Sequence, residues 1–169
     1  MDNIILIGMP GSGKSSVGVV LAKTMGYDFL DGDLLIQSRE GALLQDILNS
    51  RGVEGFLDLE GEVLSAIRCR KTVIAPGGSC VCRKAAMEHL QSLGTVVYLR
   101  LSYEQMERRI HNLATRGIAL QPGQTLRQVY DWRAPLYEAF AHITVDADGQ
   151  NLYETLEAVR RVLAQKKAL

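Results

Sequence analysis

The stretch that most constrains the fold lies near the amino terminus, where an apolar run enters a glycine-rich loop. Residues 3–7 (NIILI) are followed by residues 8–15 (GMPGSGKS) and then by an apolar helical pattern at residues 16–25. The loop fits the pattern G-x-x-x-x-G-K-[S/T], which binds phosphate groups when it joins a strand to a helix. Because both flanking segments fit that context, the sequence predicts a phosphate-binding loop in preference to an ordinary turn.

The residue types in this loop indicate a nucleotide. A triphosphate carries several negative charges, and backbone N–H groups at the amino end of a helix can surround it. Glycines leave room for that approach, the lysine reaches the β- and γ-phosphates, and the following hydroxyl is a ligand for Mg²⁺. We therefore expect a site for ATP and Mg²⁺ that includes Gly11, Ser12, Gly13, Lys14, Ser15 and Ser16.

Strand and helix patterns alternate along the rest of the chain. Strands are predicted at residues 27–30, 72–75, 95–101 and 143–145, and helices at 34–48 with a break near Gly41, 53–67, 103–111, 126–140 and 152–163. Strands that are apolar along their whole length are typical of a parallel sheet covered by helices on both faces. With 169 residues, of which 47% are apolar, the chain fits one doubly wound α/β domain.

Two carboxylates follow the second predicted strand. Asp31 and Asp33 therefore lie at the carboxyl edge of the sheet, where open α/β sheets bind ligands. Asp31 is a candidate for holding Mg²⁺ through water, and Asp33 for accepting a hydrogen bond, or a proton, from a substrate hydroxyl. The alternative is that each only caps the next helix. Their pairing beside a phosphate loop favours the functional interpretation.

A glycine turn and two arginines are further candidates. Gly77 and Gly78 end the third strand at the same edge, where they either let a substrate contact the backbone or simply form a tight turn. Arg109 and Arg116 flank the start of a segment that contains glycine and proline. A loop arginine that closes over the γ-phosphate would stabilise the charge in transfer. The alternative is a solvated charge at a helix end.

One acidic residue lies beside an apolar stripe. Glu60 falls near the stripe of the helix predicted at residues 53–67, and a carboxylate there needs a partner. We expect Arg133 to be that partner. The alternative places Glu60 at the margin of the stripe, in contact with water.

Charge and cysteine content exclude several classes of function. Nineteen basic and nineteen acidic side chains cancel, so no overall field favours nucleic acid or an anionic membrane. The three cysteines lack the spacing of a zinc site and fit small buried thiols in a reducing compartment. We expect neither a membrane-spanning segment nor a signal peptide.

Taken in order and spacing, the motifs resemble those of the shikimate kinase family over nearly the whole chain. The resemblance implies a P-loop NTPase of three layers, α/β/α, with a five-stranded parallel sheet in the order 2-3-1-4-5. It also implies ATP-dependent transfer of the γ-phosphoryl group to a hydroxyl of shikimate or a related acid. The matching segments are GMPGSGKSS (8–16), FLDGD (29–33), GFLDLEGEVL (55–64), APGGSCV (75–81), TRGIAL (115–120) and WRAPLYEAF (132–140).

The resemblance also implies residue roles. Lys14, Asp33 and Arg116 would be catalytic, Arg109 would lie against adenine, and Arg133 would bind the substrate carboxylate. MgATP would be held by the phosphate loop together with Asp31. The acceptor site would also include Leu57, Glu60, Gly77 and Gly78. The chain would be a monomeric cytoplasmic enzyme with one kinase domain (1–169), a mobile lid at about 112–125 and a substrate-binding helical region at about 33–60.

Three positions depart from the family pattern. The family's substrate helix normally has Phe-Arg where this chain has Phe56-Leu57, its glycine turn has a third glycine at Ser79, and its lid has proline at Gly117. An arginine–carboxylate pair contributes about 1.5–3 kcal/mol, and Leu57 is predicted to form an apolar wall of the acceptor pocket instead. Two alternatives therefore stay open: a kinase of a gluconate-like or other polyol acid, and a nucleotide-binding regulator without transfer activity.

Overall fold

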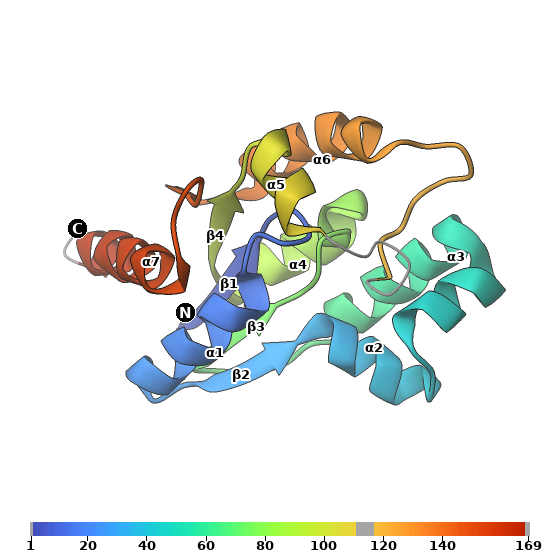
Figure 1. Cartoon of the computed structure of the whole chain (residues 1–169). Coiled ribbons are helices and arrows are strands. Elements are labelled where there is room, and N and C mark those ends of the chain that lie inside the picture. Colours follow the sequence, from blue (N-terminus) through green and yellow to red (C-terminus); the bar gives the residue numbers. More distant parts are fainter. Residues whose placement is uncertain (1, 111–116, 168–169) are drawn as a thin grey trace.

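A five-stranded parallel sheet forms the centre of the computed structural model, which describes residues 2–110 and 117–167 (Figure 1). The order across the sheet is β2-β3-β1-β4-β5, and each neighbouring pair is parallel. The predicted fold class and strand order are therefore confirmed. The strands are β1 (Asn3–Ile7), β2 (Asp28–Asp31), β3 (Thr72–Ala75), β4 (Gly94–Arg100) and β5 (Ile143–Asp146).

Helices connect the strands and cover both faces of the sheet. They are α1 (Lys14–Met25), α2 (Gly32–Glu40), α3 (Leu44–Ser65), α4 (Lys84–Leu93), α5 (Tyr103–Arg109), α6 (Leu126–Phe140) and α7 (Leu152–Lys167), with a short 3-10 helix η1 (Cys80–Cys82). The predicted break at Gly41 is confirmed, because Gly41 ends α2 with a φ of 65°. None of the described helices is long and apolar enough to cross a membrane.

Helix α4 is absent from the sequence prediction. It buries Ala86, Met87 and Leu90 on one face, which is a helical spacing. Its first residue follows Arg83, which makes no side-chain cap hydrogen bond, so the start lacks the serine, threonine or acidic residue that marks most helix starts. The short apolar pattern without a capping signal explains why the helix was missed.

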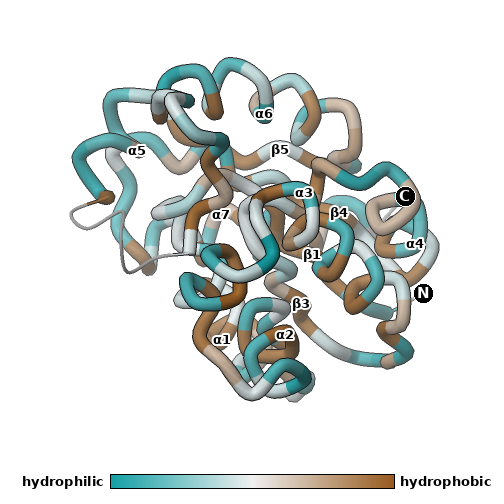
Figure 2. Tube along the Cα trace, turned by 90° about the vertical axis from the view of Figure 1, so that its right-hand side faces the viewer, coloured by the Kyte–Doolittle hydropathy of each residue, from teal (hydrophilic) through white to brown (hydrophobic). Residues whose placement is uncertain are grey.

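The core has one apolar cluster on each face of the sheet. Although every residue of β1 is buried, Ile5 and Ile7 belong to one cluster, whereas Ile4 and Leu6 belong to the other. Helices α1 and α7 pack on the side of Ile4, while α4, α6 and the end of α3 pack on the side of Ile5. Figure 2 shows hydrophilic residues along the outer turns of α5 and α6. A third cluster joins α2 to α3.

The parallel register brings three connections to one edge of the sheet. Ile5 of β1 lies beside Ile74 of β3, and Asp31 at the end of β2 lies beside Ala75 at the end of β3. The loop after β1, the carboxylates after β2 and the turn after β3 therefore meet at the carboxyl end of the sheet. Open α/β sheets bind ligands at this edge.

Candidate functional site

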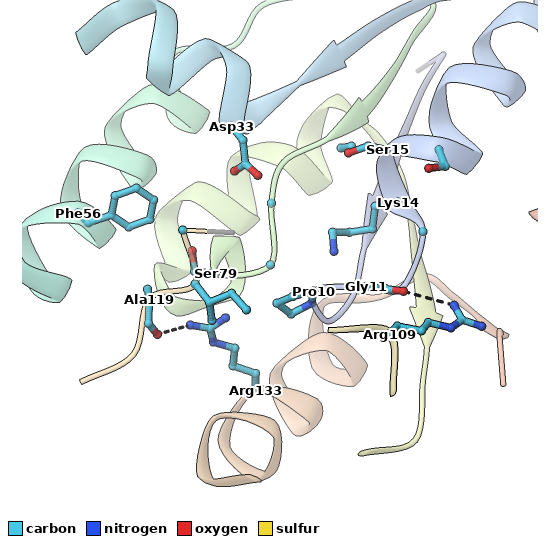
Figure 3. Close-up of a pocket in the computed structure, with 17 residues that line it drawn as sticks. Pro10, Gly11, Lys14, Ser15, Asp33, Phe56, Ser79, Arg109, Ala119 and Arg133 are labelled. Atoms are coloured by element: carbon cyan, nitrogen blue, oxygen red, sulfur yellow. Dashed lines mark hydrogen bonds between the residues drawn. The ribbon is translucent and has the colours of Figure 1, made fainter. Parts of the chain in front are cut away.

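A cavity of about 430 Å³ opens at the carboxyl edge of the sheet (Figure 3). One half is formed by the loop after β1 and the start of α1. The other half is formed by the turn after β3, the start of α2, and residues of α3 and α6. The lining residues are Pro10, Gly11, Gly13, Lys14, Ser15, Ser16, Asp33, Phe56, Ala75, Gly77, Gly78, Ser79, Arg109, Gly117, Ile118, Ala119 and Arg133.

The loop at residues 8–15 is a concave stretch of backbone. Gly11 and Gly13 have φ angles of 81° and 89°, in the left-handed region that side chains disfavour. A Cβ atom on Gly11 would also lie 3.2 Å from Cβ of Arg109. Gly13 caps α1 without a side-chain hydrogen bond, so the first N–H groups of the helix lack side-chain acceptors. This arrangement suits an anion.

Lys14 lies in the middle of this loop. Its Nζ donates to the carbonyls of Gly8 (2.9 Å) and Met9 (2.8 Å) and to Ser12 Oγ (3.4 Å). Burial lowers the pKa of Lys14 from 10.5 to about 8, against the opposing attraction of Asp33. The ammonium group is therefore protonated at neutral pH, and a bound polyanion would stabilise that charge further.

Ser15 and Asp31 bring two oxygen ligands together. Ser15 Oγ donates to Oδ2 of Asp31 over 2.9 Å, while Oδ1 of Asp31 accepts from the backbone N–H groups of Asp33 and Leu34. Asp31 is thus the N-cap of α2, which was the alternative to a functional role, and its other oxygen also faces the phosphate loop. A hydroxyl and a carboxylate oxygen are the hard ligands that Mg²⁺ prefers, so this pair fits the ion.

Asp33 lies across the cavity from the phosphate loop. Burial and the nearby Asp31 carboxylate raise the pKa of Asp33 to about 6, while Lys14 opposes the shift. A Cβ atom on Gly77 would lie 2.8 Å from Oδ1 of Asp33, and Gly77 has a φ of 108°. The glycine therefore lets the carboxylate approach the turn, and Asp33 stays mostly ionised at neutral pH.

The structure corrects the expected partner of Glu60. Its side chain is 2% exposed, so the position is not at a wet margin, and Oε1 accepts a hydrogen bond from Ser79 Oγ at 2.7 Å. Among the described residues no ion pair joins Glu60 to Arg133. Burial raises the pKa of Glu60 to about 8, and the Ser79 hydrogen bond opposes that rise. The serine hydroxyl provides the hydrogen bond that was expected from a cation.

The raised pKa of Glu60 predicts a pH-dependent stability. Between about pH 4.5 and 8 the folded protein keeps a proton that the unfolded chain releases, so the free energy of unfolding falls as pH rises through this window. Each unit of difference corresponds to about 1.4 kcal/mol. Glu60→Gln removes this loss. We expect the melting temperature of the variant, relative to the unsubstituted protein, to increase steadily from pH 5 to 8.5.

The control is Glu62→Gln on the same helix. The Glu62 side chain is 65% exposed and pairs with Arg39 at the surface. Its substitution is therefore expected to leave the pH dependence of the free energy of unfolding unchanged. A constant offset between Glu60→Gln and the unsubstituted protein over this pH range would contradict the assigned burial of an ionisable Glu60.

Arg133, on α6, reaches the half of the cavity that lies opposite the phosphate loop. It is 1% exposed, and its Nη2 donates to the carbonyl of Ala119 over 2.9 Å (Figure 3). Its Nε has no hydrogen-bond partner although it is buried. A buried guanidinium with an unused donor is equipped to bind an anionic group of a ligand.

The expectation that Leu57 forms a wall of this cavity is wrong. Phe56 and Leu57 are both 1% exposed and both belong to the apolar cluster of α2 and α3, but of the two only Phe56 is among the described residues that line the cavity. Successive helical residues point about 100° apart, so the two neighbours face different surroundings. The cavity thus gains no apolar surface from Leu57, and it has no arginine at that position.

Arg109 ties the phosphate loop to the segment after β5. Its guanidinium donates to the carbonyls of Gly11 (3.3 Å), Ala147 (3.3 Å) and Gln150 (3.2 Å). It also lines the cavity on the side of the phosphate loop. Arg116, expected in the lid, lies outside the described residues.

The residues predicted for the site and the residues that line the cavity agree only in part. Ser16, Gly77 and Gly78 line the cavity as expected, while Ser12 is buried and receives a hydrogen bond from Lys14. The cavity also contains lining residues that are absent from the predicted site, which are Pro10, Phe56, Ala75, Ser79, Gly117, Ile118 and Ala119. For Ser79, the position beside two glycines at a strand end is the available signal.

Comparison with known proteins gives consistent results. A family model described as shikimate kinase matches residues 10–164. A shikimate kinase of Thiobacillus denitrificans is 38% identical over 155 residues, covering 89% of this chain and 84% of its own. The structure of a shikimate kinase from Acinetobacter baumannii in complex with shikimate aligns with a TM-score of 0.88 and 31% identity over 99% of this chain and 95% of its own. A gluconokinase from Sinorhizobium meliloti aligns with a TM-score of 0.56 and 25% identity over 98% and 95%.

Proposed function

The chain belongs to the shikimate kinase family, and from this premise we propose that it transfers the γ-phosphoryl group of ATP to a hydroxyl of shikimate. The observation that carries the proposal is the composition of one cavity. Lys14 and Ser15 lie in one half of it, and Asp33 and Arg133 lie in the other. A phosphate site and an acceptor site that share a cavity allow direct transfer between two bound molecules.

The phosphate half neutralises charge. Lys14, protonated and surrounded by backbone, binds the β- and γ-phosphates in place of its present carbonyl partners. The N–H groups at the start of α1 bind the remaining phosphate oxygens. Ser15 and Asp31 would hold Mg²⁺, which supplies further positive charge to the phosphates when bound.

The acceptor half orients the nucleophile. Asp33 accepts a hydrogen bond from the reacting hydroxyl and takes its proton as the new oxygen–phosphorus bond forms and the bond to the β-phosphate oxygen breaks. Arg133 donates from its unpartnered Nε to the carboxylate of shikimate. Because Leu57 lies in the core, Arg133 binds that carboxylate without a second arginine from position 57. We therefore expect a lower affinity for the carboxylate than a site with two arginines would have.

The remaining assignments extend this proposal. We extend it to a lid at residues 112–125, whose Arg116 lies outside the described residues and would neutralise charge on the γ-phosphate, and to Arg109 as a contact of the adenine base. Residues 33–60 form the substrate-binding region of a single kinase domain. The enzyme acts as a monomer in the cytoplasm, in the biosynthesis of aromatic amino acids.

The test is ADP release, coupled to a spectroscopic readout, in the presence of MgATP and one acceptor at a time. We expect ADP release that depends on shikimate and saturates with it, and none above background with gluconate. If gluconate or another polyol acid stimulates release and shikimate does not, the acceptor is a different one. If MgATP binds but no acceptor stimulates release, the chain is a nucleotide-binding regulator.

A further inference from the structure

The turn after β3 is held rigidly in the wall of the acceptor half. Tyr137 Oη donates a hydrogen bond to the Gly78 carbonyl from α6, and Pro10 of the phosphate loop lies against Gly78. Ser79 is 7% exposed, lines the cavity and donates to Glu60. The Ser79 hydroxyl is therefore fixed in position before any ligand arrives.

Glu60 contacts this turn at two points. Oε1 accepts from Ser79 Oγ at 2.7 Å, and Oε2 lies 3.2 Å from the point where a Cβ atom on Gly77 would be. On the cavity side of Gly77, the same point lies 2.8 Å from Oδ1 of Asp33. Two carboxyl groups thus flank Gly77, and that of Glu60 is the one that orients Ser79.

The hydrogen-bond direction determines what Ser79 offers a ligand. Ser79 Oγ donates to Oε1 of Glu60, an oxygen that can accept whether or not Glu60 carries its proton on the other oxygen, so the serine oxygen has lone pairs available to the cavity. Lone pairs accept from a neutral hydroxyl and repel a carboxylate. Among the described residues that line the acceptor half, Arg133 is the cation, so an anionic group is directed there and not to the turn.

We propose, resting on the proposed function, that Ser79 selects the acceptor by accepting a hydrogen bond from a hydroxyl other than the one that is phosphorylated, with Glu60 as its positioning residue. A site built to bind a hydroxyl discriminates strongly against an analogue without it, because a buried polar group is left unpaired. The preferred acceptor is therefore a monocarboxylic acid with at least two hydroxyls.

The experiment measures KM for shikimate and for analogues that each lack one non-reacting hydroxyl. In the unsubstituted protein, removing the hydroxyl that Ser79 contacts raises KM by roughly 10-fold. Ser79→Ala raises KM for shikimate by roughly the same factor, leaves KM for ATP within about twofold, and abolishes discrimination against that one analogue. Glu60→Ala raises the shikimate KM as well, and Glu60→Gln, whose amide oxygen still accepts from Ser79, raises it less.

Ser92→Ala is the matched control, because the exposed Ser92 hydroxyl donates to the His89 carbonyl within α4 and does not line the cavity. If Ser79 serves only as the hydrogen-bond donor to Glu60, Ser79→Ala lowers the melting temperature. The ratio between the KM for the analogue that lacks the hydroxyl and the KM for shikimate then stays unchanged. That result would overturn the inference while the proposed function stands. An unsubstituted protein with no shikimate-dependent ADP release would instead remove the proposed function, and this inference with it.

Discussion

Replacement of Lys14 by methionine is expected to lower kcat by about 10³-fold, which is the cost of removing a preorganised charge from a phosphoryl-transfer site. Lys14 is 8% exposed and has three acceptors around its Nζ, so the ammonium group is held within the loop until the phosphates replace those acceptors. Methionine has a similar length and no charge. The measurement is steady-state ADP release at saturating ATP and shikimate, together with the affinity for MgADP.

The comparison variant is Lys23→Met, which removes an exposed lysine from the last turn of the same helix. We expect its kcat to stay within about twofold of the unsubstituted value, since surface charges far from a site contribute little. A Lys14→Met enzyme that retained a third of the original kcat would show that the loop does not place this ammonium group on the transferred phosphate.

Substitution of Asp33 by asparagine is the second large effect. We expect kcat/KM for shikimate to fall by about 10²- to 10³-fold, because an amide can accept the hydroxyl's hydrogen bond but cannot take its proton. The KM for ATP changes little, since Asp33 belongs to the acceptor half of the cavity. Initial rates over both substrate concentrations separate the two effects.

Asp131→Asn serves as the control for Asp33→Asn. The Asp131 side chain is exposed on α6 and pairs with Arg127 at the surface, so its loss alters surface charge and leaves the cavity unchanged. Should Asp33→Asn instead raise KM for ATP and leave kcat unchanged, Asp33 would belong to the nucleotide side, and the division of the cavity proposed above would be wrong.

The sequence predicts the phosphate loop well because its chemistry is local. A strand end, left-handed glycines, a lysine and a hydroxyl lie within eight consecutive residues, and each has a function that depends on its neighbours in the chain. The carboxyl edge could also be predicted, since parallel strands place Asp33 and Gly77 there whatever the details of packing.

Contacts across the fold were harder to predict. Glu60 and Ser79 lie on different elements, and no pattern in the sequence states that a hydroxyl from the turn, and not Arg133, reaches the buried carboxylate. The side that Leu57 faces depends on how α3 rotates against α2, which is settled by packing among apolar residues. Helix α4 was missed because its start has no capping residue.

The burial of Leu57 makes an arginine at this position costly. Such an arginine would enter a cluster that includes Ile36, Leu44 and Ile47, and an unpaired buried charge costs several kcal/mol. Leu57→Arg would therefore lose folding stability before it added any contact with a carboxylate. A second substitution that opened a path to water, or supplied a counter-charge, would be needed to remove that cost.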